Sequence, residues 1–170
     1  MAKKKRRGRG QTRTQAARTN AARFLDAHGI PYEVREFSPE IHSATEAAAA
    51  MGADPSTVYK TLVIKRTRGK PLLVMAAGDR TVDLPVLAAS VGEKKLRLAS
   101  YNEAEELTGL QVGGISALAL LNKGFDVYID QAAQELEQIT ISAGRRGVNL
   151  CLSVSDLVQV TGARWADAGG

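Results

Sequence analysis

Residues 57–77 read TVYKTLVIKRTRGKPLLVMAA, and this stretch decides much of the fold. Two runs rich in β-branched and apolar residues, 57–65 and 71–77, flank the polar segment 66–70 with its one glycine. Such runs are typical of strands, and a short connection that contains glycine is typical of a hairpin. The stretch therefore predicts two antiparallel strands.

Lys60 lies inside the first of these strands. Because side chains alternate across a strand, Lys60 shares a face with Val58 and Leu62, and either face is apolar enough to be buried. A buried lysine loses hydration unless a polar or anionic group replaces the water. We therefore expect Lys60 to point into a pocket and bind an anionic ligand. The alternative is that its aliphatic stem carries the ammonium group out to solvent.

Helix and strand signals continue on both sides of the hairpin. Capping boxes are predicted at Ser43 with Glu46 and at Asn102 with Glu105. Helices are expected at 14–28, 43–52, 83–91, 102–109 and 153–161, and short strands at 31–37, 95–99, 127–129, 138–142 and 148–152. Helices and strands are interspersed without a regular period, which predicts a mixed α+β fold around a twisted sheet or partly closed, barrel-like sheet.

Charge separates the chain into two parts. Residues 1–18 contain eight Lys and Arg and no acidic residue, which leaves 15 basic against 18 acidic residues in 19–170. A block of like charge is typical of a disordered arm that contacts nucleic acid phosphates. A solubilising tail or a targeting sequence is the alternative. We expect a basic tail over 1–18 and a single domain over 19–170.

Several kinds of chemistry are not indicated by the sequence. The single cysteine, Cys151, cannot form an internal disulfide, which favours a reducing, cytoplasmic location. No apolar run approaches the roughly 20 residues of a membrane span. His28 and His42 have no partner at a metal-ligand spacing, so neither a metal nor another cofactor is expected. An enzyme without a recognisable protein nucleophile would depend on positioning and backbone electrostatics.

Two glycine-containing loops are candidate binding elements. The pair Gly113-Gly114 could aim backbone N–H groups at an oxyanion, although a glycine pair also suits a simple turn. The segment 142–147 carries Arg145 and Arg146, whose guanidinium groups could bind phosphate, or it could be a solvated hairpin turn.

Taken together, the strand 58–62, the segment Thr108-Gly109-x-x-Val112-Gly113-Gly114-Ile115-Ser116 and the loop Ser142-x-Gly144-Arg145-Arg146-Gly147 resemble the YbaK/EbsC family of bacterial trans-editing proteins. The Cys-tRNA(Pro) deacylase branch is the most similar. The resemblance implies a compact domain with a barrel-like mixed sheet, related to the editing domain of bacterial prolyl-tRNA synthetases. It also implies hydrolysis of the ester that joins a wrongly attached amino acid to the terminal ribose of tRNA.

The resemblance also implies roles for individual residues. Lys60 would engage the phosphate or ribose of the tRNA acceptor end, and Gly113 and Gly114 would donate hydrogen bonds to the ester carbonyl. The candidate substrate-binding residues are Phe37, Ser43, Thr61, Ile115, Ser116, Ser142, Arg145, Arg146 and Asn149.

Three positions depart from the family pattern and leave the amino-acid specificity open. Ala117 replaces a common proline, Asn149 an aspartate, and Ser43 a phenylalanine of the cysteine-specific pocket. The expected partners are the acceptor end of misacylated tRNA and, as a further candidate, prolyl-tRNA synthetase. Two alternatives stay open: a deacylase that uses water on alanine, serine or threonine esters, and a non-catalytic tRNA- or ribosome-binding module.

Overall fold

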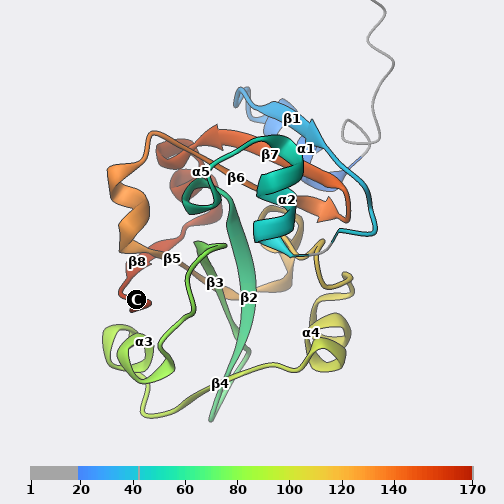
Figure 1. The fold of residues 1–170 in the computed structure, drawn as a ribbon. Coiled ribbons are helices and arrows are strands. Elements are labelled where there is room, and N and C mark those ends of the chain that lie inside the picture. Colours follow the sequence, from blue (N-terminus) through green and yellow to red (C-terminus); the bar gives the residue numbers. More distant parts are fainter. Residues whose placement is uncertain (1–18, 42, 170) are drawn as a thin grey trace, which may run out of the picture.

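The computed structural model describes residues 19–41 and 43–169, where eight strands form two sheets (Figure 1). The five-stranded sheet has the order β4-β2-β3-β5-β8, formed by β2 (Tyr59–Arg66), β3 (Leu72–Ala77), β4 (Leu96–Leu98), β5 (Asp126–Asp130) and β8 (Arg164–Ala166). The three-stranded sheet has the order β1-β7-β6, formed by β1 (Glu33–Glu36), β6 (Gln138–Arg145) and β7 (Val148–Ser153). Strands β2 and β3 are antiparallel, which confirms the predicted hairpin.

The two sheets are joined by an isolated parallel bridge between Val58 and Thr140. Beyond this bridge, β2 stays paired with β3, whereas β6 has a bulge between Ser142 and Arg145, where its register with β7 shifts. The predicted α+β class is confirmed. The predicted barrel-like sheet consists, within the described residues, of two sheets that do not form a closed barrel.

Within the described residues, five α-helices and three short 3₁₀ segments connect the strands. The α-helices are α1 (Asn20–Ala27), α2 (Ala44–Met51), α3 (Leu84–Val91), α4 (Tyr101–Thr108) and α5 (Val154–Thr161). The 3₁₀ segments are η2 (Pro55–Thr57), η3 (Leu118–Lys123) and η4 (Gln131–Glu135). Each of these α-helices begins after a Thr, Ser or Asp whose side chain accepts a hydrogen bond from a backbone N–H of the first turn. This N–H has no hydrogen-bond partner within the helix itself. None of the described helices is long and apolar enough to cross a membrane.

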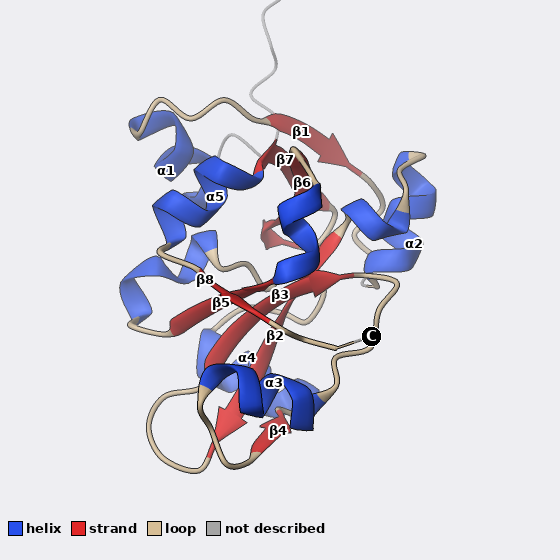
Figure 2. Ribbon diagram, turned by 90° about the vertical axis from the view of Figure 1, so that its left-hand side faces the viewer, coloured by secondary structure: helices blue, strands red, loops and turns tan. Residues whose placement is uncertain are grey.

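The five-stranded sheet is buried on both faces (Figure 2). Helix α3 covers one face, where Ile64 of β2 packs near Leu87. The three-stranded sheet and helices α1 and α5 cover the other face, which receives Tyr59 and Val63. Because β2 alternates, even-numbered side chains point toward the α3 face and odd-numbered ones toward the three-stranded sheet.

Some predictions of local structure need correction. Helix α4 is capped by Ser100 with Glu103, so the predicted cap at Asn102 with Glu105 is wrong. The earlier start lets Glu103 complete a capping box and pair with basic residues of the sheet. Strand β8 and the 3₁₀ segments were not predicted. The basic segment 1–18, the first residues of the predicted first helix and His42 lie outside the described residues.

Glu103 joins α4 to the five-stranded sheet. Its carboxylate accepts hydrogen bonds from Arg97 at 2.8 and 2.9 Å and from Lys65 at 2.8 Å, and also from the backbone N–H of Ser100 at 3.1 Å. The Arg97 guanidinium, followed by Lys65, holds the pKa of Glu103 well below its usual value of 4.5.

We expect the Glu103→Gln substitution to lower the melting temperature at neutral pH. A carboxylate with a depressed pKa in the folded state stabilises the fold above its unfolded-state pKa, and this stabilisation is lost as the pH falls through the folded-state value. The difference in melting temperature between wild type and variant should therefore shrink below about pH 4.5. Thermal unfolding measured from neutral pH to about pH 3 checks this.

The control is Glu106→Gln, on the same helix but outside the ion pairs found among the described residues. An exposed residue of this kind should shift the melting temperature by no more than about 2 °C. If the melting temperature of the wild type exceeds that of Glu103→Gln by the same amount at every pH, the role given to the carboxylate is contradicted.

Candidate functional site

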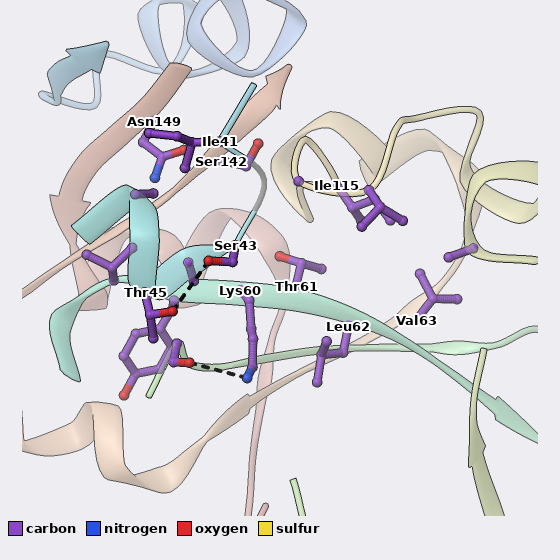
Figure 3. Close-up of a pocket in the computed structure, with 18 of the residues that line it drawn as sticks. Ile41, Ser43, Thr45, Lys60, Thr61, Leu62, Val63, Ile115, Ser142 and Asn149 are labelled. Atoms are coloured by element: carbon purple, nitrogen blue, oxygen red, sulfur yellow. Dashed lines mark hydrogen bonds between the residues drawn. The ribbon is translucent and has the colours of Figure 1, made fainter. Parts of the chain in front are cut away.

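A cavity of about 360 Å³ lies along the edge of β2, between α2, α4 and the two glycine-containing loops (Figure 3). We call it the β2-edge cavity. Its volume falls within the range of small-molecule sites. The edge is open here because β2 is bridged to β6 at Val58 and paired with β4 only from Ile64 onward, so 59–62 have no strand partner on this side within the described chain.

Both faces of β2 line this cavity, because the cavity wraps around the strand's edge. All six residues from Val58 to Val63 contribute to its wall. Figure 3 shows Thr61 projecting toward the side of Ile115 and Ser142, while Lys60 projects to the opposite side. A ligand in the cavity can therefore contact both side chains only by crossing the edge of the strand.

The main chain of Thr61 also faces the β2-edge cavity. The carbonyl of Val58 accepts the N–H of Gly78 in the direction of β3, whereas the carbonyl of Val63 accepts the N–H of Ala99 on the opposite side. Main-chain groups alternate along an antiparallel strand, so those of Thr61 point the same way as those of Val63, away from β3. This places a backbone donor and a backbone acceptor at the cavity wall.

Lys60 is half-buried and lines the cavity with Val58 and Leu62, as its strand position predicted. Its Nζ donates to the carbonyl oxygen of Arg80 at 2.7 Å and lies 3.5 Å from that of Gly78. Burial lowers the pKa of Lys60, and the Asp79 carboxylate opposes this effect. Main-chain carbonyls thus replace part of the water that the ammonium group loses.

Lys60 carries the only charge among the described residues that line the cavity. The described lining contains no carboxylate, imidazole or thiol. Tyr59 also lines the wall, but burial, with a contribution from the Asp130 carboxylate, raises its pKa to about 12, so its phenol stays protonated at neutral pH. The described wall therefore offers one cation and several neutral polar groups, without a side-chain base.

The two glycine-containing loops pack against each other beside the cavity. The Nε of Arg146 donates to the carbonyl of Val112 at 2.6 Å. A Cβ on Gly114 would lie 2.9 Å from the backbone nitrogen of Arg146, so the close approach requires glycine. Gly113 lines the cavity and has a positive φ of 90°. The N–H of Gly114 donates to the carbonyl of Gln111 at 2.8 Å, so this donor is engaged within its own turn.

The structure brings most of the predicted site residues together. Those that line the cavity are Phe37, Ser43, Lys60, Thr61, Gly113, Ile115, Ser142 and Asn149. The cavity has a polar end at Ser43, Ser142 and Asn149 and an apolar end at Leu62, Val63 and Ile115 (Figure 3).

Four predicted site residues do not line the cavity: Gly114, Ser116, Arg145 and Arg146. Ser116 is fully buried, and its hydroxyl has no hydrogen-bond partner among the described residues. Arg145 is exposed at the end of β6, and Arg146 holds the neighbouring loop. In this arrangement Arg146 contributes to the site through Val112, not by facing the cavity.

Several lining residues were missed by the sequence analysis, among them Gly78 and Tyr101. A Cβ on Gly78 would come within 2.6 Å of the Ala44 Cβ, so glycine lets α2 approach the end of β3. A glycine directly after the apolar run 72–77 was the available signal for such an approach. No group of three His, Cys, Asp or Glu side chains in the described chain is arranged to hold a metal ion.

Comparisons with known proteins show the family to which the chain belongs. The model of the aminoacyl-tRNA editing domain family matches residues 38–160. The chain is 32% identical over 152 residues to an Enterococcus faecalis protein that carries the name Cys-tRNA(Pro)/Cys-tRNA(Cys) deacylase EbsC, covering 88% of this chain and 92% of that protein. It is also 29% identical over 123 residues to the proline–tRNA ligase of Shouchella clausii, covering 72% of this chain but only 21% of the ligase.

A solved structure described as a trans-editing enzyme for prolyl-tRNA synthetase superposes with a TM-score of 0.74 at 27% identity. The match covers 89% of this chain and 98% of that one. The family match includes the strand of Lys60, both glycine-containing loops and every described residue that lines the β2-edge cavity except Phe37. The chain therefore belongs to the aminoacyl-tRNA editing domain family.

Proposed function

We propose that this protein hydrolyses the ester of mischarged aminoacyl-tRNA in trans, with Cys-tRNA(Pro) as its principal substrate. The observation that carries the proposal is the β2-edge cavity, whose described wall holds one lysine and no acidic group. Such a wall suits the anionic end of a nucleic acid, because a carboxylate there would repel phosphate. Family membership and the names of the relatives support the same substrate class.

Lys60 holds the acceptor end of the tRNA in this proposal. An ammonium group has three N–H donors, and the carbonyls of Arg80 and Gly78 account for two of them. The remaining donor is available to a phosphate or ribose oxygen. Arg80 in turn lies 3.9 Å from the buried carboxylate of Asp130, which ties the loop that holds Lys60 to β5.

The ester lies on the Thr61 side of the strand, against Gly113. Backbone N–H groups that face a carbonyl oxygen stabilise the negative charge that develops on it. Gly113 lines the cavity, and the main chain of Thr61 points into it, so both can take this role. The sequence suggested that both Gly113 and Gly114 donate to the carbonyl oxygen. In the structure the N–H of Gly114 already donates to Gln111, so the proposed donors are Gly113 and Thr61 instead.

The substrate supplies its own nucleophile in this mechanism, because the described wall has no side-chain base or thiol. The cysteine sulfur attacks the ester carbonyl carbon, and the bond from that carbon to the ribose oxygen breaks. The thiol proton ends on the ribose hydroxyl, and a four-membered thiolactone leaves, which water opens to free cysteine. The protein's contribution is to orient the reactants and stabilise the carbonyl oxygen.

The partners of the proposed reaction follow from the substrate. The acceptor end of tRNA is the ligand, and prolyl-tRNA synthetase is a candidate source of the mischarged molecule, in the cytoplasm. The likeness to part of a proline–tRNA ligase supports this connection.

A panel of misacylated tRNAs tests the function and its mechanism. We expect loss of the ester from Cys-tRNA(Pro), with Ala-tRNA(Pro) and Ser-tRNA(Pro) spared because they lack a thiol. Equal activity on the esters without a thiol would instead show a deacylase that uses water. Binding of tRNA without turnover of any ester would show a non-catalytic module.

The Lys60→Ala substitution should lower kcat/KM on Cys-tRNA(Pro) roughly 10- to 100-fold, the loss expected when a hydrogen bond from a charged group is removed. Lys70→Ala, in the exposed hairpin turn outside the cavity, is the matched control and should retain full activity. Equal activity of wild type and Lys60→Ala would remove Lys60 from the mechanism.

Removing residues 1–18 tests the basic tail separately. If its lysines and arginines bind tRNA phosphates, the slope of log affinity against log salt concentration should flatten by about 0.7 to 0.9 for each phosphate that the truncated chain no longer neutralises. Titration of uncharged tRNA at several salt concentrations measures this slope for the full chain and the truncated one. An unchanged slope would show that the tail does not bind phosphates.

A further inference from the structure

Tyr101 is an exposed aromatic side chain at the border of the β2-edge cavity. It is 72% exposed and yet lines the cavity wall. Leu98, which also lines the cavity, is 48% exposed. Exposed apolar groups that gather at a cavity mark a place where a ligand covers them. Neither side chain has a role in the ester chemistry described above.

The backbone beneath Tyr101 is held in place. Tyr101 is the first residue of α4 and follows directly on the capping residue Ser100. The capping box and the ion pairs of Glu103 fix this turn to β2 and β4. A side chain mounted on a fixed turn binds a ligand with little additional loss of conformational freedom.

The surroundings of Tyr101 leave room for a flat, apolar group. Ala104, three residues later and so on the same face of α4, lines the cavity with only a methyl group. The neighbouring wall is formed by Leu62, Val63 and Leu98. This apolar end lies away from Ser43, Ser142 and Asn149, and Lys60 projects on the opposite side of β2 from Ile115 and Ser142 (Figure 3).

The end of an aminoacylated tRNA has three chemically different parts: an amino acid, a ribose with its phosphate, and an unpaired base. Aromatic side chains recognise unpaired bases by stacking, which is favourable for any base. If Lys60 binds the phosphate or ribose and the polar end receives the amino acid, the apolar end is left for the base.

We propose that Tyr101, with Leu98 beside it, is a stacking platform for the terminal nucleobase of the tRNA 3′ end. This inference rests on the proposed function, because it places the base next to the ester in the same cavity. Tyr101 is thereby a binding residue that selects a nucleotide ester over other esters of the same amino acid.

Binding of the uncharged trinucleotide CCA tests the platform without requiring hydrolysis. Wild type should bind CCA more tightly than the same trinucleotide with an abasic final residue. Tyr101→Ala should weaken CCA binding by about 5- to 150-fold, the range that base stacking on an aromatic ring supplies. The same variant should leave binding of the abasic trinucleotide unchanged. Tyr101→Phe, which keeps the ring, should bind CCA as wild type does.

The matched control is Leu107→Ala, which changes an exposed apolar residue of α4 that does not line the cavity and should leave binding of both trinucleotides unchanged. The platform is refuted if Tyr101→Ala affects the two trinucleotides equally or affects neither. Measuring ester hydrolysis in parallel distinguishes failure of the stacking platform from failure of the proposed deacylase function. Binding of CCA that depends on Tyr101, with no turnover of any ester, would refute the deacylase alone. Turnover of the ester, together with equal affinities for CCA and for the abasic trinucleotide, would refute the platform alone.

Discussion

The bridge between Val58 and Thr140 is the constraint on which the site depends. A continuous ladder between β2 and β6 would merge the two sheets and pair the main-chain groups of β2 on this side. The pairing is not continued beyond this one bridge, so residues 59–62 keep an unpaired edge within the described chain. An open edge exposes backbone donors and acceptors, which proteins normally cover. Here α2, α4 and two loops surround the edge, and the enclosed space is the β2-edge cavity.

The cavity combines a largely apolar wall with a lysine whose ammonium group is only partly hydrogen-bonded by the protein. Lys60 is half-buried, and main-chain carbonyls hold it against β3. Attraction between opposite charges is stronger in such a site than in water, so an anionic ligand gains more from Lys60 than it would from a surface lysine. The described wall thus presents a cation without a side-chain base or thiol, which suits a reaction whose nucleophile belongs to the substrate or to water.

The features that could be predicted from the sequence are those set by local patterns. Alternation along 57–65 identified β2 and the unusual place of Lys60, and the cap at Ser43 located the start of α2. The features that were missed depend on distant partners. Strand β8 has three residues and exists through pairing with β5, and Arg146 is fixed by Val112, which is 34 residues away. Tyr101 is the first residue of α4 because the helix is capped by Ser100, two residues before the predicted cap at Asn102.

Helix α2 contributes small side chains to the polar end of the cavity, and its placement does not depend on all of them. Ser43 caps the helix, Gly52 ends it in a left-handed conformation, and Ala44 must stay small beside Gly78. Thr45 and Ala47 also line the cavity, and of these two Thr45 contacts the cap, with its hydroxyl 3.4 Å from that of Ser43. Substitutions at these two positions can reshape the polar end of the cavity, where we propose that the amino acid binds, while Ser43 and Gly52 still bound the helix. The fold therefore has a built-in route by which related proteins can acquire a different amino-acid preference on an unchanged scaffold.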